Sequence, residues 1–597
     1  MYQERLDSCQ EQTARLQARC SRIRFFRLLS FSAAAIFFCL GYTKQQYGAY
    51  AAASAAALAF LLLVACSSKQ QKQLAYLTDY ASVLLEYQAR LTDGWKQLSV
   101  KGSRYLLPPY ASPHSSDLDI FGSQSLYQYL CTASTVFGQD CLANLLSQPD
   151  RDPAGIRARQ QAVSELVRKT DFVLRFEASA RCLRASSYDS LKKALEHFFH
   201  ALELTSRTPF FLRAFFLAAP VWTLAALFCY LLGIVPDQAL ACFLTGAALQ
   251  LCAALLGNGR NSRQLAPVYK MNQTITPYRT LLELLAHEPF DSAYLQNLQQ
   301  TLAQPDALKA FKELEAIAAS VVVRHNPYAS FLLNSLFSYD FHCTERYMKW
   351  KSSCQHMLKP WLEAIGSVEA LISLGVIART RQTHTLPQLL ETDRPALSAE
   401  DLRHPLLKET AAVGNDLDLR HQTCIITGSN MSGKTTFMRS IGINLVLAYA
   451  GGFCTAKMLC ASCMEVCTSM RTADNVSEGI SSFYAELLRI KGIVETSKKE
   501  QPMLSLIDEI YKGTNSKDRI LAAKETVKNL AKPYALTILT THDLALCELE
   551  HDDSIDAVNY YFTEHYEENK ILFDYKIRQG RCTSTNARYL LHLAGIL

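Results

Sequence analysis

Four long apolar stretches, arranged as two closely spaced pairs, constrain the fold of this chain more than any other feature. They are residues 28–42, 47–66, 214–235 and 239–257. The first pair is separated by the polar run Thr43–Gln46 and the second by Pro236–Gln238, where we expect the turn. A helix of roughly 20 apolar residues can cross a bilayer. Each pair is therefore predicted to form a transmembrane helical hairpin, provided that Phe25 and Phe26 extend the short first arm.

Basic residues flank both pairs of apolar stretches. They are Arg15, Arg19, Arg22, Arg24, Arg27, Lys69 and Lys72 around the first pair, and Arg207, Arg213, Arg260 and Arg263 around the second. Because Lys and Arg accumulate on the cytoplasmic side of a membrane, we predict a multi-pass protein with both termini and the C-terminal domain in the cytoplasm. Two buried hairpins inside a soluble core are the weaker alternative. A cleaved signal peptide fits less well, since a second apolar run follows the first so closely.

Length and composition set broad limits. At 597 residues the chain exceeds the roughly 250 to 300 residues that one hydrophobic core serves, so several domains are expected. The 61 basic residues against 55 acidic ones neither demand nor exclude a nucleic-acid partner. The cysteines lie largely in apolar stretches and are predicted to be reduced thiols. Cys460 and Cys463 form a C-x2-C pair with no second pair, so we expect no metal site there.

The soluble segments on either side of the second hairpin are predicted to be helical. Leucine and alanine recur there at three- and four-residue spacing, which is typical of amphipathic helices. Such stripes form a core far more often than a cofactor site. The segments therefore predict a helical scaffold and indicate no chemistry of their own.

A glycine-rich motif follows the strand-like residues 423–427. Residues 428–435 satisfy G-x-x-x-x-G-K-[ST] and lead into a helical run. Backbone amides of such a loop cradle phosphates at a helix N-terminus, the lysine reaches the terminal phosphates and the hydroxyl binds Mg²⁺. The predicted ATP-binding residues are Gly428, Asn430, Met431, Ser432, Gly433, Lys434, Thr435 and Thr436, and Thr435 is also a predicted magnesium ligand.

Two further segments complete a predicted ATP-hydrolysing site. Residues 502–509 form an apolar strand pattern that ends in two carboxylates, of which Asp508 suits the metal and Glu509 suits the attacking water. The strand-like residues 535–541 are followed by His542, which we predict to sense the γ-phosphate or the water. An isolated histidine is more often structural, but its place at the end of a strand favours a catalytic role.

These motifs resemble those of the MutS family of ABC-type ATPases. TGSNMSGKTTFMR (427–439), NVSEGISSFYAEL (475–487) and LIDEIYKGTNSKDR (506–519) resemble its phosphate loop, signature segment and acidic strand. The family usually has Pro at the position of Ser429 and Gly at that of Ser432. Further similar segments are residues 118–166, which resemble the start of the family's helical core, HPLL (404–407), VGNDLDL (413–419), TTHDL (540–544) and the late stretch FDYKIRQGRCTSTNARYLLHLAGI.

The resemblance implies a homodimer in which Ser481 and Ser482 complete the γ-phosphate site of the partner copy. A serine helix cap is the alternative for these two residues. It also implies ATP and Mg²⁺ as ligands, and mismatched or branched DNA as a partner. We expect the family's mismatch-reading domain and its Phe-x-Glu wedge to be missing, because the residues before Leu118 are taken up by the first hairpin and a short helical stretch.

The predicted fold is an α/β P-loop (ABC-like) ATPase domain preceded by a mostly α-helical lever and core, with two transmembrane helical hairpins. The segments are a cytosolic N-terminal helix (1–24), the first hairpin (25–66), the first core part (67–206), the second hairpin (207–258), the lever (259–400) and the ATPase domain (401–597). The leading functional hypothesis is a membrane-anchored, DNA-associated ATPase clamp related to mismatch repair. An ATPase that drives a membrane protein complex or transport is the alternative. A degenerate scaffold is disfavoured because the motif residues are intact.

Overall fold

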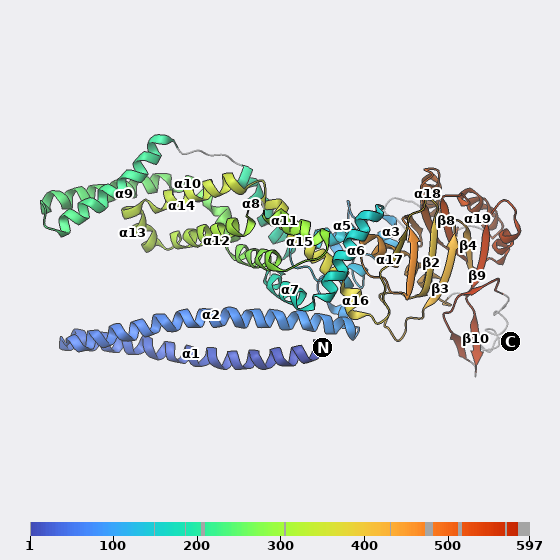
Figure 1. Cartoon of the computed structure of the whole chain (residues 1–597), viewed down its shortest axis with the longest axis horizontal. Helices are drawn as coiled ribbons and strands as arrows, with labels where there is room; N and C mark the ends of the chain where they lie inside the picture. Colours follow the sequence, from blue (N-terminus) through green and yellow to red (C-terminus); the bar gives the residue numbers. More distant parts are fainter. Residues whose placement is uncertain are drawn as a thin grey trace.

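Two helical arms extend in the same direction from a helical body, and an α/β domain lies at the opposite end of the molecule (Figure 1). The computed structural model describes residues 2–148, 150–184, 187–203, 209–303, 306–429, 431–471, 482–511, 516–567 and 570–582. The chain enters through the first arm, crosses the body, forms the second arm, returns through the body and ends in the α/β domain.

The first arm is the predicted helical hairpin. Helix α1 (Tyr2–Lys44) and helix α2 (Tyr47–Leu91) are joined by two residues, within the polar run where the turn was expected. The rings of Tyr2 and Tyr87 stack with their centroids 5.0 Å apart, which joins the start of α1 to the end of α2. Each apolar stretch is therefore one part of a longer continuous helix that reaches back to the body.

The second arm is also a helical hairpin, but its turn was predicted wrongly. Helix α9 (Phe210–Leu231) ends before residues 232–235, and Pro236 already begins helix α10 (Pro236–His287). Proline suits the first helical position, because its missing N–H has no partner there and its φ is already helical. Helix α10 then continues through Pro267 and Pro277 into the body without a break.

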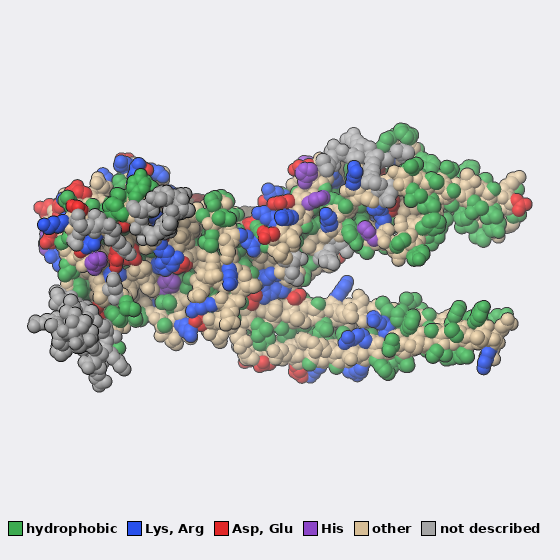
Figure 2. Space-filling view, turned by 180° about the vertical axis from the view of Figure 1, so that it is seen from behind, with side chains coloured by type: hydrophobic (Ala, Val, Ile, Leu, Met, Phe, Trp, Pro, Cys, Tyr) green, Lys and Arg blue, Asp and Glu red, His purple; other side chains and the backbone are tan. Residues whose placement is uncertain are grey.

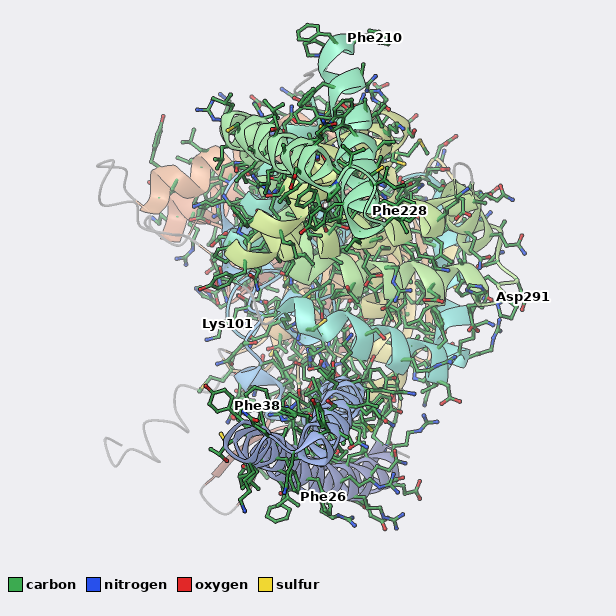
Figure 3. The ribbon with its side chains drawn as sticks, turned by 90° about the vertical axis from the view of Figure 1, so that its left-hand side faces the viewer. Phe26, Phe38, Lys101, Phe210, Phe228 and Asp291 are labelled. Atoms are coloured by element: carbon green, nitrogen blue, oxygen red, sulfur yellow. The ribbon has the colours of Figure 1, made fainter. Side chains whose placement is uncertain are left out.

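The apolar parts of both arms are exposed. In the most apolar windows of α1, α2, α9 and α10, only 0%, 6%, 17% and 22% of the residues are buried, and by length and composition all four helices can cross a membrane. Apolar side chains gather toward the far ends of the arms (Figure 2). Seen end-on, Phe26 and Phe38 on one arm and Phe210 on the other point outward (Figure 3). The alternative of hairpins buried in a soluble core is therefore wrong.

The remaining helices form the body and the flank of the second arm (Figure 1). They are α3 (Pro113–Asp117), α4 (Leu126–Leu130), α5 (Val136–Ser147), α6 (Pro153–Arg168), α7 (Thr170–Arg184), α8 (Tyr188–Glu203), α11 (Ala293–Ala303), α12 (Ala307–Arg324), α13 (Pro327–Phe337), α14 (Tyr339–Cys354), α15 (Leu358–Leu374) and α16 (Val376–Thr380), with 3-10 turns at Gly94–Gln97 and Ser103–Leu106. Helices α5, α6 and α11 pack on α15, whereas α12, α13 and α14 pack on α10. Helices α5 and α15 approach closely at Gly366, where a Cβ would lie 2.6 Å from the backbone of Phe137. The helical scaffold expected from the leucine and alanine spacing is thus present.

The α/β domain contains, among the described residues, a six-stranded, a four-stranded and a two-stranded sheet. In spatial order the first consists of β12 (Arg578–Gln579), β9 (Ala557–Tyr561), β4 (Thr423–Thr427), β8 (Ala535–Thr541), β7 (Met503–Asp508) and β6 (Glu465–Ser469), and all but β12 run parallel. The second consists of β1 (Gln388–Leu390), β5 (Met458–Ser462), β2 (Ala396–Leu402) and β3 (Asn415–Arg420), and the third of β10 (Glu564–Glu567) and β11 (Lys570–Phe573). Within the described part of the domain the helices are α17 (Lys434–Ala450), α18 (Ser482–Ser497), α19 (Ser516–Leu530) and the 3-10 helix Leu544–His551.

Asp117, at the end of α3, joins the helical body to the α/β domain. Its fully buried carboxylate accepts hydrogen bonds from the Thr468 hydroxyl at 2.7 Å and from the amides of Met470 and Arg471, both at 3.1 Å. Arg489 on α18 donates to the same carboxylate at 3.2 Å. The end of β6 and one face of α18 are therefore attached to the body through one charged group.

Candidate nucleotide-binding site

The loop between β4 and α17 contains the predicted phosphate-binding residues. Strand β4 is fully buried between β8 and β9, so its carboxyl end places the loop at the edge of the sheet. The backbone has φ of 145° at Gly428, 79° at Met431 and 106° at Gly433. A Cβ at Gly428 would lie 2.8 Å from the carbonyl oxygen of Phe562. Glycine is required there because other residues rarely adopt this backbone conformation and because no space is left for a Cβ atom.

Lys434 lies folded against this loop at the first position of α17. Its Nζ donates to the carbonyl oxygens of Gly428 at 2.6 Å and Ser429 at 2.8 Å. Burial lowers the pKa of Lys434, while the carboxylates of Glu509 and Asp508 act in the opposite direction. A buried ammonium beside loop amides at a helix N-terminus is suited to an anionic ligand.

Thr435 and Asp508 come together as a pair of oxygen donors. The Thr435 hydroxyl donates to Asp508 Oδ2 at 2.8 Å, and the Thr540 hydroxyl on β8 donates to Oδ1. Mg²⁺ prefers oxygen ligands and usually retains waters and substrate phosphates, so one or two protein oxygens suffice. The described residues contain no group of three or more His, Cys, Asp or Glu side chains able to hold a metal ion. The pair fits the predicted magnesium site.

Glu509 lies next to this pair and lines a cavity beside the loop. Its amide donates to the Thr540 carbonyl at 3.0 Å, and its φ of 51° is in the left-handed region. The strand thus ends between Asp508 and Glu509, and the two carboxylates take different directions. Asp508 bonds to the two threonine hydroxyls, whereas Glu509 faces the cavity, as their different predicted roles require.

The other predicted residues are not all at the cavity. Thr436 and Met431 line it, with Met431 strongly exposed, and the buried Ser432 donates its hydroxyl to the Ser429 carbonyl at 2.8 Å. His542 is exposed beyond the end of β8 and is not among the residues that line the cavity. Asn430 and Ser481 lie outside the described residues, as does the side chain of Ser482, the first residue of α18.

The cavity of about 700 Å³ has an apolar part as well as the cationic loop. The rings of Phe437 and Phe562 meet edge to face at 5.9 Å, and Tyr575 and His404 line the same space. Burial lowers the pKa of His404 to about 4, with the charge of Arg439 acting in the same direction. The histidine is therefore neutral at pH 7. A flat apolar region next to a cationic loop matches the two chemically different ends of a nucleotide.

Glu564 and Ser429 were not found as site residues from the sequence. The Ser429 hydroxyl donates to the buried Glu564 carboxylate, and the Ser432 hydroxyl donates to the Ser429 carbonyl. The two serines that differ from the usual family residues therefore both form hydrogen bonds that stabilise the loop. No motif marks Glu564, which follows Ser429 by 135 residues. His404, which lines the cavity, is the first residue of the HPLL segment. The resemblance of that segment to the family could therefore have identified His404 as a site residue. A wider groove of about 1640 Å³ lies between α5, α8 and α15 and contains none of the predicted site residues.

This geometry defines the class of the domain. It is a mixed α/β domain with a glycine-rich loop at the end of its central parallel strand. Within it, residues 424–596 match the family described as MutS domain V. The similarity of this chain to the MutS family lies in this C-terminal domain.

Two curated relatives illustrate the similarity. A DNA mismatch repair protein MutS from Acetivibrio thermocellus is 29% identical over 249 residues, which are 40% of this chain and 28% of the relative. The DNA mismatch repair protein spellchecker 1 from Drosophila melanogaster is 30% identical over 187 residues, which are 30% of this chain and 20% of the relative. The chain thus spans less than a third of each relative.

Proposed function

We propose that this protein is a membrane-anchored ATPase of the MutS family that hydrolyses ATP in a composite site formed by two copies and thereby switches the position of its helical arms in association with DNA. The observation that carries the proposal is the convergence of Lys434, Thr435 and Asp508 at the carboxyl end of the central strands. A cation, a hydroxyl and a carboxylate in this arrangement are the groups that hold a nucleoside triphosphate and its magnesium ion.

The chemistry follows from the position of each side chain. Lys434 exchanges its two loop carbonyls for the terminal phosphates, and the loop amides hold the remaining phosphate oxygens. Thr435 and Asp508 hold Mg²⁺, which when bound neutralises charge on the phosphates. Glu509 faces the cavity and orients the attacking water, from which it accepts the proton. His542 is proposed to act from the end of β8, where its side chain is exposed.

The composite site rests on the family resemblance. Ser481 and Ser482 of one copy are proposed to complete the γ-phosphate site of the other. Helix α18 begins at Ser482, and Arg489 on that helix is bound to Asp117 of the helical body. Closure of two domains over ATP therefore pulls on the body, and a ligand with different affinities for open and closed pairs shifts the population between them.

Membrane anchoring is supported by the exposed apolar surfaces of the two arms. Their apolar ends point in the same direction, away from the α/β domain (Figure 1), so one bilayer can accommodate both. The basic flanks predict that the ATPase domain remains in the cytoplasm. An exposed apolar surface of this extent is unfavourable in water, so it favours association with a membrane or with a protein partner.

DNA is proposed as the partner because both relatives are named as DNA mismatch repair proteins. The apolar ends of the arms favour a second candidate, an ATPase that acts on a membrane protein complex or in transport. In that case the arms transmit the nucleotide state to a partner within the bilayer. The two candidates share the ATPase site and differ in what stimulates it.

A measurement of ATP turnover by the full-length protein in lipid nanodiscs distinguishes these two candidate functions. Turnover is measured with and without duplex, mismatched or branched DNA, at two salt concentrations. The DNA-associated function predicts stimulation that weakens as salt rises, because phosphate contacts release counterions. Turnover that no DNA changes supports the membrane partner instead. Absence of turnover and of ATP binding overturns the ATPase proposal itself, and extraction of the protein from membranes by alkaline carbonate overturns the anchor.

A further inference from the structure

Helix α13 has its polar and apolar faces reversed relative to a helix on a water-soluble protein. Its polar residues Asn334 and Ser335 are buried, as is Ser338 directly after it. Its large apolar residues face outward, with Tyr328 87% and Phe331 61% exposed. The adjacent side chains Val322, Val323, Leu332 and Phe337 are exposed as well. A helix in water normally turns its apolar face to the core, so this pattern indicates a surrounding that is apolar.

Contacts along α10 establish the position of α13. Before α13, Arg324 donates to the Ser262 hydroxyl on α10 at 2.8 Å. After α13, the Ser338 hydroxyl donates to the Gln250 side chain on α10 at 2.8 Å. The twelve residues from Gln250 to Ser262 span about 18 Å of helix. Helix α13 therefore runs beside this part of α10, from outside the apolar stretch, which ends at Gly257, to about 10 Å inside it.

Helix α14 returns along α9 in the opposite sense. Near the turn, Gln250 also donates to the Thr223 hydroxyl of α9 at 2.6 Å, so one buried polar cluster joins α9, α10 and Ser338. Further along, the rings of Phe341 and Phe216 stack at 4.5 Å. Glu345 then forms an ion pair with Arg213, at the start of the apolar part of α9.

The charges near this turn do not oppose insertion. Residues 327–337 include no charged side chain. Asp340, in the first turn of α14, is almost fully buried and forms an ion pair with Arg324 at 2.8 Å. A charge that is paired inside the protein can remain at membrane depth, whereas an unpaired one is expensive. The exposed apolar face of α13 continues the apolar surface of the α9–α10 hairpin, which it contacts.

We propose that α13 and the first turn of α14 form a re-entrant segment, which enters the cytoplasmic leaflet beside the α9–α10 hairpin and presents Phe331, Leu332 and Phe337 to lipid acyl chains. The inference rests on the proposed membrane anchoring and adds a fifth membrane element to it. Because this element comes from the lever and not from the hairpins, motion of the lever moves a helix within the leaflet. The nucleotide-driven movement of the lever is then transmitted directly to the bilayer, and not only to a partner protein.

Site-specific photocrosslinking to lipid tests the proposal. Three full-length variants carry p-benzoylphenylalanine in place of Phe331, Phe228 or Leu521 and are placed in phosphatidylcholine–phosphatidylglycerol vesicles with an alkyne-tagged phosphatidylcholine. The three sites are matched, since their side chains are 61%, 62% and 64% exposed. Phe228 is in the hairpin, and Leu521 is on α19 of the α/β domain. The replacement of an exposed apolar residue leaves the fold intact.

We expect lipid labelling at Phe331 to be similar to that at Phe228 and about tenfold or more above that at Leu521. The reason is that acyl chains reach only the membrane-embedded sites. Labelling at Phe228 with only the Leu521 background at Phe331 overturns the re-entrant segment and leaves the anchor in place. Background labelling at both Phe228 and Phe331 overturns the anchor together with the segment. Crosslinks from Phe331 to a second copy or to another protein, instead of lipid, overturn the proposal in favour of a protein interface.

Discussion

Replacement of Asp117 by asparagine is predicted to loosen the contact between the helical body and the α/β domain without unfolding either. The two carboxylate oxygens accept from Thr468 and Met470 on one side, and from Arg471 and Arg489 on the other. An amide can accept on one side only, and its NH₂ group then faces donors on the other. At least two hydrogen bonds to a charged group are lost, each contributing about 1.5 to 3 kcal/mol. Because Arg489 remains partly exposed, we take the lower end, about 3 kcal/mol in total.

Hydrogen–deuterium exchange of the amides at the end of β6 measures this loss. About 3 kcal/mol of local opening free energy corresponds to on the order of a hundredfold faster exchange at Met470 and Arg471. Asp119→Asn is the matched control, since Asp119 binds Arg439 and Arg471 through side chains only and in a half-exposed position. Its effect is expected to be about 1 kcal/mol, roughly fivefold. Equal effects of the two substitutions, or none for Asp117→Asn, refute the reasoning.

Four other predictions concern the site and the core. Glu509→Gln is expected to reduce phosphate release on the order of 10² to 10⁴-fold and to trap an ATP-bound dimer on gel filtration; unchanged turnover contradicts its role. Lys434→Ala should abolish tight ATP binding in calorimetry, and retained affinity argues against the loop assignment. Because burial lowers the pKa of His404 to about 4, the unfolded chain takes up its proton near pH 6.5 and the folded chain does not. This residue therefore lowers stability by about 2 kcal/mol at pH 5 relative to pH 7; His404→Asn should remove that part of the acid shift in thermal unfolding. Gly366→Ala should destabilise by about 1 to 3 kcal/mol, because its Cβ meets the backbone of α5. Gly492→Ala on open helix surface should not, and similar melting temperatures for the two variants contradict the packing argument.

Local sequence patterns were sufficient for several parts of this protein. The apolar hairpins, the strand–loop–helix of residues 423–450 and the paired carboxylates Asp508 and Glu509 all depend on contiguous residues, and their secondary structure appears where it was expected. The turn of the second hairpin was misplaced because proline was interpreted as a turn residue, although it equally suits the first position of a helix. The roles of the site residues and the membrane topology remain predictions from sequence.

Only the tertiary structure brought distant residues together. Glu564 meets Ser429 across 135 residues, and Asp117 meets Thr468 across 351. Neither contact leaves a trace in local periodicity, because each depends on which strand ends and helix ends become neighbours. The exposed apolar face of α13 is a second case, since a short run of phenylalanine and leucine is ordinarily read as core. Sequence determines which segments are apolar, helical or glycine-rich; packing alone decides which face of a helix is covered, because burial is a property of the assembled neighbours.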